Sequence, residues 1–379
     1  MARDNGKDPA RVPEPTLIFY PSEEAHTPTP PDDFANVFHL LRAKEIPRVA
    51  HHRPPEVSPH NKQSRLEAEL LYSAPIIDDV KKALKSIHEA VANAQNISFS
   101  EIGGLVGEMA CGVERNPDAM LWLARLRSAD QYSYDHALDV SVHMMVFARF
   151  LGLPLRTIEE LGVAGLMQDV GKVEIPAAVL GKAGHLTDEE YQLVQSHVAA
   201  SLEMLVGHDG FSSNILDIIA SHHERADGSG YPRRLKGERI GFHGELAGLV
   251  DTYCAMTRDR VYGIAVSSQK ALEALNHLRG NKFREPVVDQ FIQCIGLYPI
   301  GSLVELNSGE VGVVIQQNKV RRLKPRLLIV LGPDKSVERH PITIDLMNDP
   351  TAQTGVPYRI VQALPANAYG IDPAEFYIG

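Results

Sequence analysis

Cysteine is scarce in this chain, and its spacing does not pair it. Cys111, Cys254 and Cys294 are the only three cysteines among 379 residues, and none belongs to a CxxC pair. A disulfide framework and a thiolate zinc site both need clustered cysteines, so neither is suggested by the sequence. This usage is typical of a protein of the reducing cytoplasm, which is the location we expect.

Net positive charge and long apolar runs are lacking too. The formal net charge is -10. Broad binding to DNA or to an anionic membrane surface needs clustered positive charge, so we expect neither. The most apolar stretch, about residues 140–155, is interrupted by His143 and Arg149, and the N-terminus has no apolar signal segment. We therefore predict no membrane span and no signal peptide.

Proline is concentrated in residues 1–65, which hold eleven of the 25 prolines. Because proline breaks helices and removes backbone donors, we predict an irregular, partly disordered N-terminal segment. Within it, residues 34–43 have a helical pattern and residues 16–20 have strand composition. The remnant of a small sheet-containing domain is therefore an alternative for this segment.

Residues 66–300 are dominated by helical periodicity. Apolar residues from Ile76 to Val91 recur at i, i+3, i+4 and i+7, which predicts a long helix over 76–94. Ser98 or Ser100 can cap the next helix. Further helices are predicted at 117–127, 133–151, 156–168, 187–206, 211–223, 244–257, 267–279 and 285–295. The expected domain is a helical bundle.

Strand patterns occur only in the last part of the chain, residues 301–379. Short apolar runs at 302–306, 311–316 and 326–331 flank a turn at Gly309. We predict a small antiparallel β appendage followed by a tail. The fold class is thus mainly α.

Several polar residues lie isolated among apolar neighbours in the predicted helices. They are His136, Asp169, His197, the pair His222-His223, and Asp251. Helical bundles build metal sites from such scattered ligands, and a divalent ion offsets the cost of burying a carboxylate. Mixed imidazole and carboxylate ligands suit iron, manganese or zinc better than calcium. A carboxylate such as Asp169 can bridge two ions that activate water for phosphoryl transfer.

The segment from His222 to Pro232 reads His-His-Glu-Arg-Ala-Asp-Gly-Ser-Gly-Tyr-Pro. It resembles the signature of the HD-GYP family. Similar segments follow the family's order and spacing at 134–136, 168–176, 186–197, 251–262 and 298–302, so the likeness covers about residues 75–330. The resemblance implies an HD-type helical bundle. It also implies a bacterial phosphodiesterase that hydrolyses cyclic di-GMP to linear pGpG and, in some members, to GMP.

The resemblance also implies which residues bind metal. Asp169 would bridge, and His197, His222 and His223 would complete one site. The second site would use His136, Asp251 and the histidine of a His-Asp dipeptide, whose place Gln168 takes here. A third site would need a glutamate where Tyr132 stands. We therefore expect one or two divalent transition-metal ions, iron, manganese or zinc, with magnesium as a further candidate.

By the same resemblance, Asp169 and Lys172 are the expected catalytic residues, and Lys172 would approach a substrate phosphate. Arg260 would pair with the phosphate or base, although Gly263 stands where the family often has another basic residue. The loop with Gly228, Gly230, Tyr231 and Pro232 would line the substrate or bind a diguanylate cyclase (GGDEF) domain. The helix over 76–94 could also form the seam of a homodimer.

Gln168 decides how active such a site can be. It offers a neutral amide oxygen, which is a poor ligand for zinc or ferrous iron but acceptable to harder ions. Altering even a residue behind a ligand costs about 10 to 100-fold in metal affinity or activity. Three hypotheses stay open: a phosphodiesterase of reduced activity, a non-catalytic effector that binds cyclic di-GMP or a cyclase, and another nucleotide phosphohydrolase, which the Gly-Tyr-Pro loop disfavours.

Overall fold

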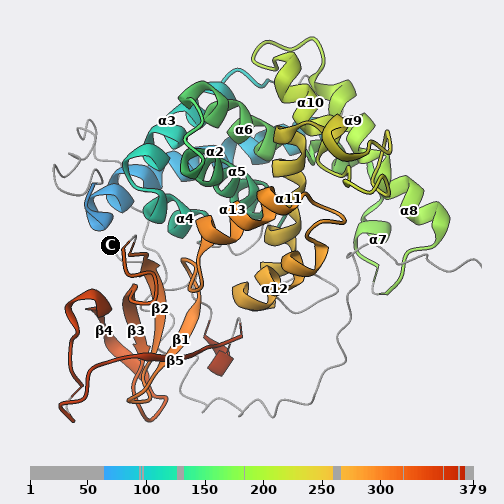
Figure 1. The fold of residues 1–379 in the computed structure, drawn as a ribbon. Helices are drawn as coiled ribbons and strands as arrows, with labels where there is room; N and C mark the ends of the chain where they lie inside the picture. Colours follow the sequence, from blue (N-terminus) through green and yellow to red (C-terminus); the bar gives the residue numbers. More distant parts are fainter. Residues whose placement is uncertain are drawn as a thin grey trace, which may run out of the picture.

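The computed structural model describes residues 64–93, 95, 98–125, 132–182, 184–258, 266–318, 320–352, 354–365 and 368–371. A helical bundle is followed by a five-stranded antiparallel sheet (Figure 1). The mainly α class with a small antiparallel appendage is therefore confirmed. The predictions for residues 1–63 and for Arg260 lie outside the described residues.

The bundle is built around α5 (Tyr132–Phe150) and α11 (Phe242–Thr257), which carry the candidate ligands His136 and Asp251. Both helices are buried on nearly all sides, which is typical of helices at the centre of a domain. The surrounding helices are α2 (Leu66–Ala92), α3 (Ile102–Arg115), α4 (Pro117–Arg125), α6 (Leu155–Met167), α9 (His197–Leu205), α10 (Ser213–Ser221) and α13 (Glu285–Ile295).

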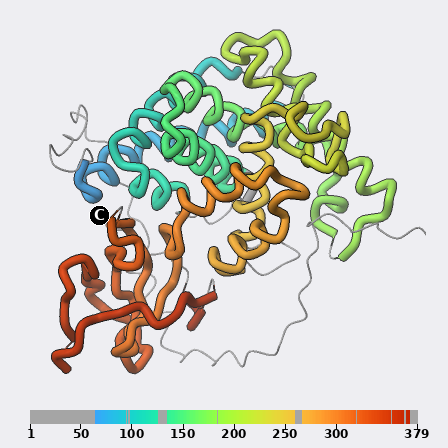
Figure 2. Tube along the Cα trace, in the orientation of Figure 1, coloured from blue at the N-terminus to red at the C-terminus, as the bar shows by residue number. Residues whose placement is uncertain are grey.

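Shorter elements lie toward the edge of the bundle. They are η2 (Val170–Glu174), α7 (Ala177–Leu180), α8 (Asp188–Gln195), η3 (Gly237–Ile240) and α12 (Ser268–Leu278). In Figure 2, α7 and α8 lie at the right edge in light green, and the sheet lies at the lower left in orange and red. Among the described helices, none combines the length and apolarity that crossing a bilayer requires.

Two helix predictions were wrong in their limits. The helix predicted over 76–94 begins at Leu66, and Pro75 lies inside it. Leu70, Ala74 and Ile77 form a buried face that continues past the proline, so packing outweighs the lost backbone donor. The apolar face of this α2 helix packs on α3, α4 and α5 of the same chain.

The helix predicted over 187–206 is two helices, α8 and α9, with a break at Ser196. The Ser196 hydroxyl donates to the carbonyl of Leu193 at 2.7 Å, a local bond of the kind that competes with helix geometry. His197 therefore opens α9 and does not lie in the middle of one long helix.

The sheet has the order β4-β3-β2-β1-β5. The predicted strands are β1 (Leu303–Leu306), β2 (Val311–Gln316) and β3 (Arg326–Leu331); β4 (Val337–Asp345) and β5 (Ile360–Ala363) were not predicted. These two strands form the edges of the sheet. Most of their side chains are exposed or half-buried, so their sequences lack a continuous apolar run. The sheet meets the bundle where the backbone N–H of Gln317 donates to Asp118 of α4 at 3.0 Å.

Candidate metal centre

Four of the predicted ligands lie together and are called the first ligand group. They are Asp169, His197, His222 and His223, and their ligand atoms all lie within 4.8 Å of one another. The Nε2 atoms of His197 and His222 lie 3.2 and 3.8 Å from Oδ1 of Asp169. Residues from three separate stretches of the sequence therefore converge on one carboxylate oxygen.

A close approach between η2 and α9 brings Asp169 to His197. A Cβ on Gly171 would lie 2.3 Å from the carbonyl oxygen of His197, so only glycine fits there. Ser201 joins the same two segments, because its hydroxyl accepts from the N–H of Gly171 at 2.9 Å and donates to the carbonyl of Gln168 at 3.0 Å. Asp169 is thereby fixed beside the first turn of α9.

The backbone sets the tautomers of the two buried histidines. Nδ1 of His197 lies 2.5 Å from the carbonyl of Val194, and Nδ1 of His222 lies 2.7 Å from the carbonyl of Ile219. Since a carbonyl can only accept, Nδ1 carries the proton and each Nε2 keeps a lone pair. Burial lowers the pKa of His222 to about 4, so this imidazole is neutral at neutral pH.

These atoms fit a divalent metal ion. Within the described structure, Nε2 of His197, Nε2 of His222 and Oδ1 of Asp169 are buried and have no hydrogen-bond partner. Three acceptors facing one another repel, and each unsatisfied buried group costs about 1 to 3 kcal/mol. A cation between them removes both costs, and the donor set is the one that transition metals prefer.

The second ligand group consists of His136, Gln168, Asp169 and Asp251. Nε2 of His136 lies 3.0 Å from Oδ1 of Asp251 and 4.0 Å from Oδ2 of Asp169. Burial alone would raise the pKa of Asp251, but the bond with His136 and the charges of His136 and Lys172 together outweigh it and hold that pKa at about 2.

Gln168 is 1% exposed and lies inside this second group. Its amide nitrogen donates to Oδ1 of Asp251 at 3.2 Å, and its buried Oε1 has no hydrogen-bond partner among the described residues. The reverse orientation would place two oxygens against each other, so the bonding network assigns this one. The amide N–H thus points at a carboxylate that a metal ion would need.

Lys172 pairs with the shared carboxylate. Its Nζ lies 2.7 Å from Oδ2 of Asp169, and its side chain is 35% exposed. Burial alone would raise the pKa of Asp169, but the positive charge of Lys172 is the largest of the influences that hold it well below its usual range. Lys172 therefore places a positive charge at the solvent side of the centre.

Tyr231 of the Gly-Tyr-Pro loop stacks on His223. The two ring centroids are 4.6 Å apart with an interplanar angle of 22°, and the N–H of Tyr231 donates to the carbonyl of His223 at 3.2 Å. A Cβ on Gly230 would lie 2.4 Å from that carbonyl, which explains the glycine. Gly228 has φ +82° and Pro232 is exposed.

Glu224, which the sequence pattern did not single out, holds this loop. Its buried carboxylate accepts from the N–H of Arg233 at 2.7 Å and from the N–H of Leu235 at 2.8 Å. The only available signal was the position of an acidic residue directly after His222-His223. Glu224 thereby ties the loop to the segment that supplies two ligands.

A further set of potential ligand atoms, from Asp139, His143 and Cys254, is already neutralised. Asp139 pairs with Arg258 at 2.9 Å and with His143 at 3.1 Å, and both acid and guanidinium are buried. Burial raises the pKa of the Cys254 thiol well above its usual value, so the thiolate that binds metals is disfavoured. This set is a structural ion-pair network.

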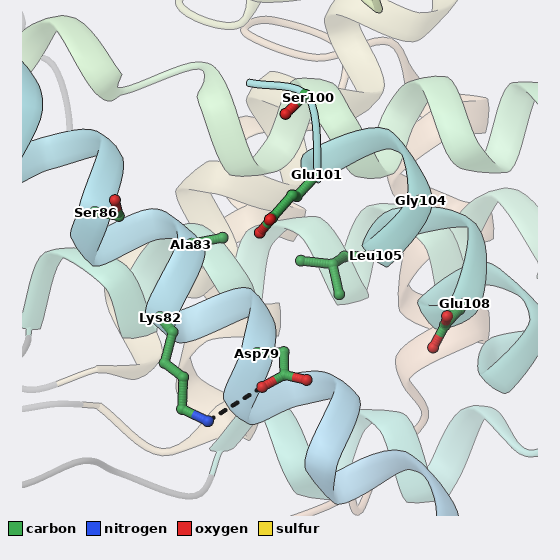
Figure 3. Close-up of a pocket in the computed structure, with 9 residues that line it drawn as sticks. All are labelled: Asp79, Lys82, Ala83, Ser86, Ser100, Glu101, Gly104, Leu105 and Glu108. Carbon is green, nitrogen blue, oxygen red and sulfur yellow. Dashed lines mark hydrogen bonds and ion pairs between the residues drawn. The ribbon is translucent and has the colours of Figure 1, made fainter. Parts of the chain in front are cut away.

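A groove of about 590 Å³ runs between α2 and α3 (Figure 3). Its lining includes Asp79, Lys82, Glu101 and Glu108 but no member of either ligand group. The groove is therefore separate from the candidate metal centre.

Comparison with known proteins assigns the class. A family model described as HD domain matches residues 122–285. The solved structure of Bd1817, a HDG"Y"P protein from Bdellovibrio bacteriovorus, aligns with a TM-score of 0.50 and 13% identity over 68% of this chain and 76% of its own, which supports the fold alone. The family match and the helical bundle are those of an HD-domain protein.

Two relatives narrow this class. Cyclic di-GMP phosphodiesterase PA4108 of Pseudomonas aeruginosa is 34% identical over 304 residues, which are 80% of this chain and 72% of that protein. 3'3'-cGAMP-specific phosphodiesterase 1 of Vibrio cholerae is 31% identical over 45% of this chain and 39% of its own length. The chain belongs to the HD-GYP family. Phosphodiesterases of this kind depend on metal, and the two ligand groups could hold it.

Proposed function

We propose that this protein is a metal-dependent phosphodiesterase that hydrolyses cyclic di-GMP to linear pGpG and GMP, with activity reduced by Gln168. The observation that carries the proposal is the first ligand group. Its buried lone pairs from His197 and His222 face Asp169 without another partner in the described structure. The relatives with this domain are named as phosphodiesterases, and most of them as cyclic di-GMP phosphodiesterases.

In this proposal, Asp169 is the carboxylate common to both ligand groups. His197, His222 and His223 complete the first group, and His136, Gln168 and Asp251 complete the second. Iron, manganese or zinc suits the first group, whereas manganese or magnesium suits a second group that contains an amide oxygen. Bound divalent ions supply the Lewis acidity that lowers the pKa of water and neutralises phosphate charge.

Lys172 and the loop handle the substrate. Lys172 is exposed enough to leave Asp169 and bind a non-bridging phosphate oxygen, where its positive charge stabilises the charge that develops during attack. We assign Tyr231 to the substrate-binding loop, where its buried ring stacks on His223. Gly228, Gly230 and Pro232 shape the same loop, and we assign Arg260 to the phosphate or base.

Gln168 weakens the second group in two ways. Its oxygen is a poorer ligand than an imidazole nitrogen, and its N–H already occupies one oxygen of Asp251. A metal ion that binds through this oxygen must compete with that hydrogen bond. We therefore expect one tightly bound ion per chain and one weakly bound ion.

The decisive experiment follows cyclic di-GMP and its products with metal-reconstituted protein. Purified protein loaded with manganese, iron or magnesium should form linear pGpG slowly, and 3'3'-cGAMP should be tested beside it as the substrate of a related enzyme. No product with any of these metals would refute the enzymatic proposal. Metal analysis that gives two tightly held ions would refute the expected weakness of the second group.

The second candidate function is a non-catalytic effector that binds cyclic di-GMP. It is favoured by the Gln168 to Asp251 hydrogen bond, which stabilises the second group without metal. Calorimetry that detects binding without turnover would support it, and no binding would exclude this ligand. A diguanylate cyclase domain bound at the loop from Gly228 to Pro232, and a homodimer, stay predictions.

A further inference from the structure

Helix α2 contacts the residue directly before His136. Nζ of Lys81 lies 3.1 Å from Oδ1 of Asp135, and the two side chains are 11% and 5% exposed. A buried ion pair resists separation, because displacing either partner leaves a buried charge without its partner. Lys81 therefore fixes the position of Asp135 relative to α2.

His88 makes a second contact from the same face of α2. It follows Lys81 by seven residues, which is two helical turns. Its ring meets the ring of Tyr134 edge to face, with centroids 4.7 Å apart, and its Nδ1 lies 2.9 Å from the carbonyl of Leu84. Two consecutive residues, Tyr134 and Asp135, are thus held by α2 just before the ligand His136.

The beginning of α5 needs such support. The first N–H groups of a helix have no partner within the helix, so its first turn is held less firmly than its middle. Tyr134 and Asp135 lie in this first turn, and His136 follows it directly as the fifth residue of α5. Its partners Asp169 and Asp251 are themselves expected ligands. The α2 contacts come from outside the metal centre. Helix α2 also packs on η2, the segment that follows the shared ligand Asp169, so the comparison of the two ions must be made within the same variant.

We propose that Lys81 and His88 are positioning residues for His136, and that they set the affinity of the second ligand group for its ion. They act through Asp135 and Tyr134 and do not touch the reacting atoms. The inference rests on the proposed metal centre but not on its substrate, so a binding measurement can test it without hydrolysis.

The test is a titration of metal-free protein with manganese, in which calorimetry and electron paramagnetic resonance measure the binding of each ion. It is run in the natural sequence and in a Gln168→His background, where the second ion binds more tightly. Lys81→Met should weaken the second ion roughly tenfold and leave the first unchanged, since indirect support of a ligand is typically worth about 10 to 100-fold. Lys81→Arg should restore most of the affinity.

Lys82→Met is the matched control. Lys82 is the next residue of α2 but is 67% exposed and pairs with Asp79 at the groove on the other side of the helix (Figure 3). It should change neither ion. Equal weakening of both ions by Lys81→Met, or equal effects of Lys81→Met and Lys82→Met, would overturn the proposal.

His88→Leu covers the case in which Lys81→Met does not fold, because it removes the ring contact without leaving a buried carboxylate unpaired. It should weaken the second ion several-fold, with the first ion and the thermal unfolding little changed. Unchanged affinity in this variant would overturn the proposal. A Gln168→His protein that binds only one ion would also overturn it, since no second position would exist to be set. If the natural protein bound both ions but did not hydrolyse cyclic di-GMP, that result would count against the proposed function and not against this inference.

Discussion

The two ligand groups share Asp169 but are held in place by different means. In the first, His197 and His222 are fully buried, and each is oriented by a carbonyl three residues earlier in its own segment. In the second, His136 and Gln168 both bond to Asp251, so the candidate ligands satisfy one another. The first group has unpaired acceptors that a cation would satisfy, whereas the acceptors of the second are already partly satisfied. In the proposed metal centre, one amide would therefore separate a strong position from a weak one around a common carboxylate.

The largest effect is expected from Asp169→Asn, which removes the element common to both groups. Both ions should be lost, and hydrolysis should fall by much more than about 100-fold, because changes behind a ligand already cost about 10 to 100-fold. Metal content and initial rates measure this. Asp217→Asn, on the exposed side of α10, is the matched control. If Asp169→Asn kept one tightly bound ion, the shared role of Asp169 would be wrong.

His197→Asn and His136→Asn separate the two groups. His197→Asn should abolish the tight ion, whereas His136→Asn should leave it and remove only the weak one. Both should lower hydrolysis at least about 100-fold, so metal stoichiometry distinguishes them and activity does not. The same stoichiometry in both variants would mean that the two groups are not independent positions.

Gln168→His should strengthen the weaker group. An imidazole nitrogen replaces the amide oxygen, and the N–H bond to Asp251 is lost, so second-ion affinity and hydrolysis should rise about 10 to 100-fold. Gln168→Met, which fills similar space without a good ligand for manganese, is the comparison. Equal rates for the natural protein and the Gln168→Met variant would show that the amide oxygen does not serve as a ligand. No gain with histidine would show that Gln168 is not the weak point.

The fold was predictable wherever the pattern is local. Helix α13 lies where its apolar spacing predicts, with Pro286 at its start. The limits of α2 were not predictable, because Pro75 is a local signal for a helix end and the burial that overrides it comes from α3 and α4. The edge strands β4 and β5 were missed since pairing with neighbours, and not composition, makes them strands.

The candidate site shows the same limit. Isolated polar residues and family spacing indicated the ligand set, and the structure brings these residues together. The roles of Glu224, Ser201 and Lys81 depend on partners distant in sequence or on backbone N–H groups. Side-chain type and spacing carry no such information. The orientation of the Gln168 amide likewise follows from Asp251, which lies 83 residues later.

The smallest effect on catalysis is expected from proton linkage, because it concerns the stability of the metal-free chain. The folded pKa of His222 is about 4, below the unfolded value of 6.5. Between these values the unfolded chain binds a proton that the folded chain does not, so stability is retained above pH 6.5 and lost as pH falls toward 4. His222 alone accounts for about 3 kcal/mol, at about 1.4 kcal/mol per pKa unit.

Asp251 of the second group has the same sign but a different window. Its folded pKa is about 2 against an ordinary value of 3.8, so its contribution is lost only as pH falls below 3.8. Chemical denaturation of metal-free protein from about pH 7 to about pH 4 should therefore report His222 and His223 of the first group together with His88 and His243, whose pKa values burial also lowers. His222→Gln should flatten this slope, whereas the exposed His185→Gln should not. If the free energy of unfolding of His222→Gln fell with pH as steeply as that of the natural protein, the lowered pKa of His222 would not be the cause of this pH dependence.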